Sequence, residues 1–152
     1  DFAKFLKPDP VLADTLRSLR DDAGFNLVVF SNAPRKYVLN CLEALTVREF
    51  FADSAVFGVD DVLPACKPEV AAFDTVLRAV GASAERAVMF EDSMKNIRAC
   101  SSTGMQTVLI DEAGELGGGE ARGGDAKLLC DTPCAAHPSV GVTLQHIGQL
   151  RE

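Results

Sequence analysis

The sequence predicts an α/β fold built on a doubly wound parallel sheet, in which helices cover both faces of the sheet. Three observations predict this class. Short apolar segments rich in β-branched and aromatic residues recur along the chain, segments with helical spacing of apolar residues alternate with them, and turn-forming residues separate the two kinds. Strands and helices that alternate in this way form parallel sheets with right-handed crossover connections.

The first predicted elements are a helix, a strand and a second helix. Residues 8–20 have apolar positions at helical spacing, with Asp9 as the N-cap and Pro10 in the first turn. Residues 27–30 are apolar without alternation, which is typical of a strand buried on both faces of a parallel sheet. Pro34 then opens a helix. Its apolar residues are Tyr37, Val38, Cys41, Leu42 and Leu45.

The same alternation continues to residue 112. Strands are predicted at residues 55–57, 87–90 and 106–110, a loop at 60–66, and helices from Lys67 onward and at 93–102. The helix from Lys67 has Phe73, Val76, Leu77 and Val80 on one face. Gly104 ends the last of these helices before the strand that follows it.

The chain changes character after residue 112. Glycines crowd between acidic residues, which predicts a flexible surface loop over residues 113–139. Residues 140–144 predict an edge strand and residues 147–151 a short terminal helix. We therefore expect one domain over residues 1–152, with the motif-bearing part at 5–112, the Gly-rich insertion at 113–139 and the terminal strand and helix at 140–152.

Size and composition are those of one globular domain. A chain of 152 residues has no room for a second full core, and 47% hydrophobic with 24% charged residues excludes a disordered or collagen-like chain. The longest apolar runs are a few residues long, whereas a membrane span needs about 20. The formal net charge is −7 without any basic run, so neither nucleic acid nor a membrane is an expected partner.

Five cysteines are spread along the chain, an odd number in a chain large enough to bury a core without disulfides. They are Cys41, Cys66, Cys100, Cys130 and Cys134. Such usage predicts free thiols in a reducing, cytoplasmic compartment. The sequence does not indicate an oligomeric state.

Polar residues follow the predicted strands at the points where ligands of open parallel sheets bind. Ser31 and Asn32 follow the first strand, Glu91 and Asp92 follow the third, and Lys67 opens the helix between them. The set offers a hydroxyl, backbone N–H groups, one compact cation and a pair of carboxylates. It suits a phosphate bound beside Mg²⁺, because carboxylates are hard oxygen ligands for that ion.

Each of these residues has a functional and a structural interpretation. Lys67 can neutralise phosphate at a helix N-terminus, and the Ser31 hydroxyl and Asn32 N–H can donate to a phosphoryl oxygen. Alternatively, Ser31 caps the helix after Pro34, and the acidic pair 91–92 caps the helix near Ser93. Lys67, taken alone, is most simply a solvated surface lysine, as most lysines are.

Three segments resemble motifs II, III and IV of the haloacid dehalogenase (HAD) superfamily in order and spacing. They are VVFSNAP with Ser31, CKPEVAAF with Lys67, and VMFEDSMKNI with Glu91 and Asp92, followed by GMQTVLI. The resemblance covers residues 5–112. Within the superfamily it is most similar to pyrimidine 5′-nucleotidase-like phosphatases, which carry a segment like the Lys-Pro-Asp of residues 7–9 ahead of motif II.

The resemblance implies a HAD-like core and a role for each residue. Ser31 would bind the phosphoryl group, Lys67 would stabilise a phosphoaspartate, and Asp92 with Glu91 would hold Mg²⁺. The implied function is a Mg²⁺-dependent phosphomonoesterase that acts on a small phosphorylated metabolite, such as a pyrimidine nucleoside 5′-monophosphate. The alternative is an inactive relative or fragment that binds phosphate and Mg²⁺ without turnover.

One motif of the superfamily has no counterpart ahead of Phe5. Motif I, DxDx(T/V), supplies the nucleophilic Asp on the first central strand. We expect this strand, the nucleophile and most of the cap to be missing here, and the 152-residue chain alone to be an inactive piece of a longer phosphatase. Two alternatives stay open: Asp111 within residues 108–116 acts as a permuted motif I, or strands 27–30 and 87–90 pair directly.

Two further groups of residues suggest weaker hypotheses. Cys130, Cys134 and His137, with His146 nearby, have ligand types that suit zinc, although their spacing matches no common zinc pattern. Cys66 beside Lys67 is a candidate reactive thiol, and a packed or bystander thiol is the simpler interpretation.

Overall fold

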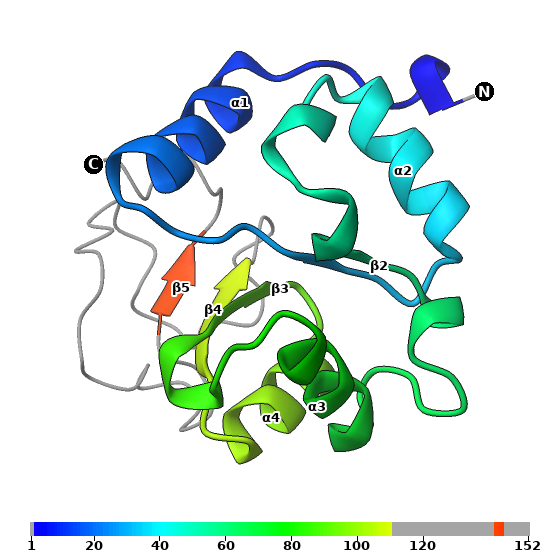
Figure 1. Ribbon diagram of the computed structural model, residues 1–152. Coiled ribbons are helices and arrows are strands. Elements are labelled where there is room, and N and C mark those ends of the chain that lie inside the picture. Colours follow the sequence, from blue (N-terminus) through cyan, green and yellow to red (C-terminus); the bar gives the residue numbers. More distant parts are fainter. Residues whose placement is uncertain (1, 111–141, 145–152) are drawn as a thin grey trace, which may run out of the picture.

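A computed structural model of the chain describes residues 2–110 and 142–144 (Figure 1). Helices and parallel strands alternate through this part, which confirms the predicted α/β class. The helices are α1 (Pro10–Arg17), α2 (Arg35–Ala44), α3 (Val70–Ala79) and α4 (Met94–Ser102). The strands are β1 (Val29–Phe30), β2 (Val56–Phe57), β3 (Val88–Glu91), β4 (Gln106–Ile110) and β5 (Val142–Leu144).

The strands form two parallel sheets. β1 pairs with β2, and β3 pairs with β4, which pairs with β5. Within residues 2–110 and 142–144, β1 and β3 are not paired with each other. The alternative in which residues 27–30 and 87–90 pair directly is therefore not the arrangement of this structure.

Strand β2 shows how helices cover both faces of the fold. Its two residues are buried and belong to different core clusters: Val56 packs with Leu16 and Leu42 of α1 and α2, whereas Phe57 packs with Val76 of α3. Successive strand residues point to opposite faces. Figure 1 shows the same arrangement, with α1 and α2 on one side of the strands and α3 and α4 on the other.

Local signals account for α1 and β4 as predicted. The Asp9 carboxylate accepts a hydrogen bond from the Val11 N–H at 2.9 Å and so caps α1, with Pro10 as its first residue. Gly104 ends α4 with a φ of +92°, which glycine adopts at little cost, and β4 begins two residues later at Gln106.

Helix α2 begins later than a cap by Ser31 would require. Its first residue is Arg35, and the Arg35 N–H donates to Asp60 Oδ1 at 2.7 Å, so a residue 25 positions away caps the helix. Gly58 makes this approach possible, because a Cβ at that position would overlap the backbone N and Cα of Arg35. The structure thus gives the capping role to Asp60 and not to Ser31.

Two further expectations need correction. Strand β1 is shorter than predicted and only half-buried, with Val28 just before it 37% exposed, because the described residues leave one side of it without a strand partner. Helix α3 begins at Val70 and not at Lys67. Lys67 lies outside the helix because its own N–H and C=O are bound by the side chain of Asn32.

Several predictions fall outside the described residues. These are the Gly-rich segment 113–139, the terminal helix at 147–151, the permuted motif with Asp111, and the cysteine and histidine group Cys130, Cys134, His137 and His146. The domain boundaries stay predictions. Within the described residues, no helix combines the length and apolar character needed to cross a bilayer.

Candidate functional site

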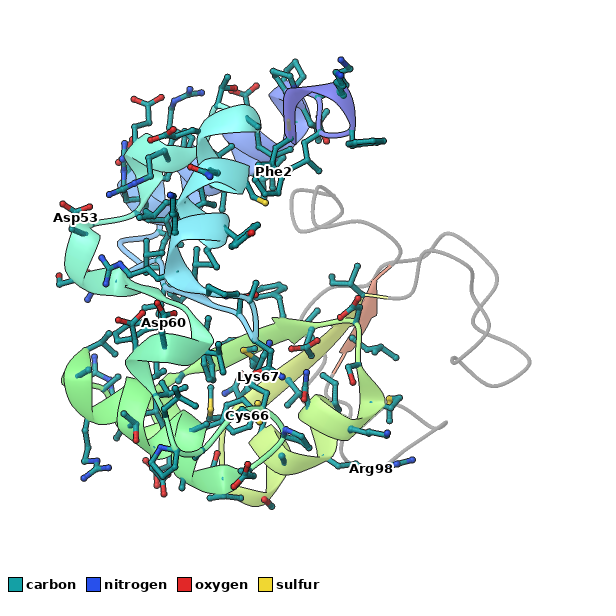
Figure 2. All side chains as sticks on the ribbon, turned by 90° about the vertical axis from the view of Figure 1, so that its right-hand side faces the viewer. Phe2, Asp53, Asp60, Cys66, Lys67 and Arg98 are labelled. Carbon is teal, nitrogen blue, oxygen red and sulfur yellow. The ribbon has the colours of Figure 1, made fainter. Side chains whose placement is uncertain are left out.

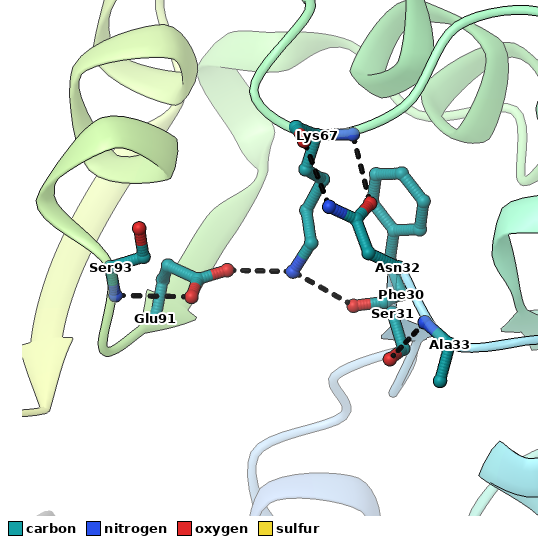
Figure 3. A network of polar contacts seen from close by, with 7 residues as sticks. All are labelled: Phe30, Ser31, Asn32, Ala33, Lys67, Glu91 and Ser93. Atoms are coloured by element: carbon teal, nitrogen blue, oxygen red, sulfur yellow. Dashed lines mark hydrogen bonds and ion pairs between the residues drawn. The ribbon is translucent and has the colours of Figure 1, made fainter.

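The candidate site lies where β1 and β3 end. In Figure 2 Lys67 lies in the middle of the molecule, between the helical layers. Its Nζ donates to the backbone oxygen of Phe30, the last residue of β1, at 3.2 Å, and to Glu91 Oε2, on the last residue of β3, at 2.7 Å (Figure 3). One ammonium group therefore joins the ends of two strands that do not pair with each other.

The Lys67–Glu91 ion pair is almost completely removed from solvent. The side chains of Lys67 and Glu91 are 9% and 6% exposed, and Lys67 Nζ also lies 5.3 Å from the ring centroid of Phe30. Desolvating two charges costs free energy that only good geometry and further hydrogen bonds offset. The residues around this pair must therefore hold it in place.

Both carboxylate oxygens of Glu91 have partners. Oε2 accepts from Lys67, and Oε1 accepts from the Ser93 N–H at 3.1 Å, just before α4. Burial alone would raise the pKa of Glu91, but hydrogen bonds from Asp92 and from Lys67 outweigh it and hold the pKa below its usual range. Glu91 is therefore ionised, and it contributes to the cap of α4 while it pairs with Lys67.

Asp92 behaves differently from its neighbour, although both are carboxylates. It is exposed, and its pKa is raised, first by the hydrogen bond with the Glu91 carboxyl group and then by partial burial. Two adjacent carboxylates that share a proton are a donor set to which a divalent cation can bind. In the described residues no group of three or more metal-ligating side chains occurs.

Ser31 ends the β1 segment and turns the chain. Its N–H donates to Phe57 O at 3.0 Å, which extends the ladder with β2, and its Oγ accepts from the Ala33 N–H at 3.1 Å. The Oγ contact is a local turn and leaves the hydroxyl proton for donation to another acceptor. The sequence placed this hydroxyl at the strand end, and the structure has it there.

The carboxamide of Asn32 faces Lys67. Nδ2 donates to Lys67 O at 2.8 Å, and Oδ1 accepts from the Lys67 N–H at 2.9 Å (Figure 3). Sequence reasoning used only the backbone N–H of Asn32 and missed this side-chain contact, as it missed the Phe30 oxygen. No local signal could reveal either contact, because both partners of Lys67 lie more than 30 residues away in the chain.

The structure joins Ser31, Asn32, Lys67 and Glu91 at one place. Asp60, which caps α2, is not part of it, and Figure 2 shows it nearer the rim of the molecule than Lys67. The thiol of Cys66 lies 3.6 Å from Glu69 Oε1, while the Lys67 ammonium beside it is committed to Glu91. This arrangement favours the bystander interpretation of Cys66.

Comparisons with known proteins give relatives of one kind. Phosphoglycolate phosphatase of Pseudomonas putida is 29% identical over 143 residues, covering 89% of this chain and 50% of that protein. A phosphorylated carbohydrates phosphatase of Thermotoga maritima is 27% identical over 107 residues, covering 70% of this chain and 48% of that protein. This chain thus spans about half the length of these curated relatives.

A solved structure and a family model agree with these relatives. The crystal structure of a HAD phosphatase from Thermococcus onnurineus superposes with a TM-score of 0.70 at 26% identity, covering 94% of this chain and 56% of that one. The predicted likeness to pyrimidine 5′-nucleotidases in particular stays a prediction. The model of haloacid dehalogenase-like hydrolases matches residues 2–104. Because that match spans well over half of its residues, this chain belongs to the haloacid dehalogenase-like hydrolases.

Proposed function

We propose that this chain forms the phosphate-binding core of a phosphomonoesterase that acts on a small phosphorylated metabolite. The observation that carries the proposal is the almost buried Lys67–Glu91 pair, which joins the ends of β1 and β3 beside the hydroxyl of Ser31. A fixed cation with little water around it stabilises developing negative charge far more than one in bulk solvent. Relatives named as phosphatases support the same activity.

Lys67, Ser31 and Asn32 are the proposed hydrogen-bond donors to the phosphate. The ammonium of Lys67 has three N–H donors, of which Phe30 and Glu91 use two, so the third can donate to a phosphoryl oxygen. The Ser31 hydroxyl and the Asn32 N–H are the other proposed donors. Lys67 would thereby stabilise charge on the transferring group while Glu91 keeps the ammonium in position.

Mg²⁺ is the proposed metal, and the residues at the end of β3 fit it. Asp92, which is exposed, would supply a carboxylate oxygen, and Glu91 beside it would contribute electrostatically or as a second ligand. Mg²⁺ is commonly bound by only one or two carboxylates, with water and phosphate as its other ligands. When bound, it would neutralise charge on the phosphoryl oxygens.

The substrate is proposed only by class. The named relatives act on phosphoglycolate and on phosphorylated carbohydrates, and the resemblance in the sequence suggests a pyrimidine nucleoside 5′-monophosphate. All three are small phosphomonoesters, so they form a suitable panel for an assay. A cytoplasmic location is proposed with them, because Cys41, Cys66 and Cys100 are free thiols.

A second candidate function is binding without turnover. It is favoured by the surroundings of Lys67, whose ion-pair partner within residues 2–110 and 142–144 is Glu91 and no other carboxylate. The nucleophilic aspartate that the resemblance implies has no counterpart in this pairing. We therefore propose that the 152-residue chain by itself binds phosphate and does not hydrolyse the ester.

Calorimetric titration of the chain with inorganic phosphate, with and without Mg²⁺, tests both candidates. Saturable binding that Mg²⁺ strengthens is expected, and Lys67→Met should abolish it, whereas Lys36→Met, an exposed lysine of α2, should not. Phosphate release from the three-member panel then separates enzyme from binding protein. Binding that survives Lys67→Met, or no binding at all, would overturn the proposal.

A further inference from the structure

The side chain of Asn32 forms hydrogen bonds with both the backbone N–H and the backbone C=O of Lys67, as a neighbouring strand would. Its carboxamide accepts from the Lys67 N–H at 2.9 Å and donates to the Lys67 C=O at 2.8 Å, so one side chain satisfies both backbone groups of one residue (Figure 3). Both distances are those of good hydrogen bonds. The two residues are 35 positions apart, so this contact ties the loop before α3 to the end of β1.

Lys67 needs such a contact because no regular element holds it. It precedes the first residue of α3 by three positions, and it belongs to neither sheet. Within the described residues, the backbone hydrogen bonds of Lys67 go to Asn32 alone. The Glu69 N–H closes a turn around Lys67 by donating to the Cys66 oxygen at 2.7 Å, and the Asn32 contacts fix that turn to the end of β1. The Lys67 side chain therefore loses less conformational entropy when its ammonium docks.

The end of β1 holds both the backbone and the ammonium of Lys67. Phe30 accepts from the ammonium through its backbone oxygen, and Asn32, two residues later, binds the backbone of Lys67 through its side chain. The backbone of Lys67 and its ammonium are therefore each held by the same short segment, the first by Asn32 and the second by Phe30. Glu91 supplies the third point from β3.

We propose that Asn32 is a positioning residue, whose carboxamide fixes the backbone of Lys67 so that the ammonium lies between the ends of β1 and β3. Its side chain then holds Lys67 and is not a phosphate ligand. The role of the positioned ammonium rests on the proposed function, but the positioning itself does not. A displacement of about 1 Å at such a group is enough to cost roughly a hundredfold in rate.

The test measures the reactivity of Lys67 directly. The chain and its Asn32→Ala and Asn32→Asp variants are treated with sulfosuccinimidyl acetate, and acetylation of each lysine is followed by peptide mass spectrometry. In the unaltered chain Lys67 should react far more slowly than the exposed lysines Lys36 and Lys95. Asn32→Ala should raise the rate at Lys67 about tenfold, as expected for loss of two hydrogen bonds, and leave the other two lysines unchanged.

The second variant and a control separate positioning from general damage. Asn32→Asp keeps an acceptor for the Lys67 N–H but loses the donor to the Lys67 C=O, so it should raise the rate as well. Asn26→Ala, an exposed asparagine ahead of β1, should not. Alkylation of the buried Cys100 reports unfolding. An unchanged rate at Lys67 in folded variants overturns the proposal.

Phosphate titration of the same variants distinguishes the two proposals. Weaker phosphate binding with unchanged Lys67 reactivity would make the Asn32 side chain a ligand and overturn positioning. Raised Lys67 reactivity in a chain that never binds phosphate would uphold positioning and remove the proposed function. If both variants unfold, hydrogen exchange of the unaltered chain decides, because a Lys67 N–H that exchanges as fast as exposed loop amides contradicts the contact.

Discussion

Two polar networks tie distant segments of the chain together, one at the start of α2 and one at the ends of β1 and β3, and they differ in exposure. In the first, Arg35 lies 3.7 Å from Asp61 with both side chains about 30% exposed, at 31% and 28%. In the second, Lys67 and Glu91 lie 2.7 Å apart at 9% and 6% exposure. In each network a side-chain oxygen accepts a hydrogen bond from a distant backbone N–H. Asp60 accepts from Arg35 in the first, and Asn32 accepts from Lys67 in the second.

The difference in exposure suggests different roles: the exposed network stabilises the fold, and the buried network forms the candidate site. The exposed network satisfies the N-terminus of α2 and closes a turn at Gly58, which are needs of the fold alone. The buried network keeps a charged pair out of water at the ends of two strands, where it contributes little to stability. The use that we propose for this pair is to bind a phosphoryl group beside it. Burial, more than the number of contacts, distinguishes the candidate site.

The largest expected effect comes from neutralising one member of each ion pair with an isosteric change. Glu91→Gln leaves the Lys67 ammonium buried without its counter-charge, and we expect a loss of about 3 kcal/mol in the free energy of unfolding. Asp61→Asn is the matched change in the exposed network and should cost about 0.5 kcal/mol or less. Urea denaturation without added metal measures both.

Equal losses for Glu91→Gln and Asp61→Asn would contradict the distinction between the networks. The double variant Lys67→Met with Glu91→Gln adds a control, because it removes both charges. It should recover most of the loss, since neither charge is then left buried alone.

A smaller effect is expected at the turn of the exposed network. Gly58 has a φ of −98°, which any residue can adopt, so backbone strain is not the reason for glycine here. A Cβ would instead overlap the backbone N and Cα of Arg35. Gly58→Ala should therefore lower the free energy of unfolding by about 2 kcal/mol, and Ser54→Ala, an exposed neighbour, should change it little.

The thermal unfolding of Gly58→Ala also bears on the comparison itself. If the exposed network serves only the fold, Gly58→Ala should lower the melting temperature and leave phosphate binding at Lys67 unchanged. Loss of binding in a folded variant would show that the two networks act together.

The sequence predicted elements whose signals are local. Asp9 before Pro10 marks the start of α1, and Gly104 before residues 106–110 marks β4, because caps and turns are properties of a few neighbouring residues. The periodic positions Val38 and Val76 are buried as expected. The carboxyl ends of the strands also indicated where Ser31 and Glu91 lie.

Contacts between distant residues were beyond the same reasoning. The predicted helix start at Lys67 is wrong because the carboxamide of Asn32 holds the Lys67 backbone outside α3. The capping of α2 by Asp60 has the same origin. Which carboxylate pairs with Lys67 depends on how two sheets lie in space, and no spacing along the chain encodes that.

The smallest effect is expected at the thiol of Cys100, which is buried near Glu91 of the second network. Burial, with the charge of Glu91 as a second cause, raises the pKa of Cys100 from 9.0 to about 12. The thiol is then neutral in the folded chain at pH 8, and iodoacetamide should modify the half-buried Cys41 and Cys66 long before Cys100. Rapid labelling of Cys100 in a folded chain would contradict this burial.

The raised pKa also predicts the sign of a pH effect on stability. Below pH 9 the Cys100 thiol is protonated in both the folded and the unfolded chain, so it does not change the free energy of unfolding. As the pH rises from 9 toward 12, the thiol ionises in the unfolded chain only, and the folded state loses stability. Other groups titrate there too, so the measurement is the difference between the chain and its Cys100→Ala variant. In Glu91→Gln the charge that helps to raise the pKa of Cys100 is gone, so the loss should begin at the same pH but end at a lower pH and be smaller in total, which links this effect to the buried pair.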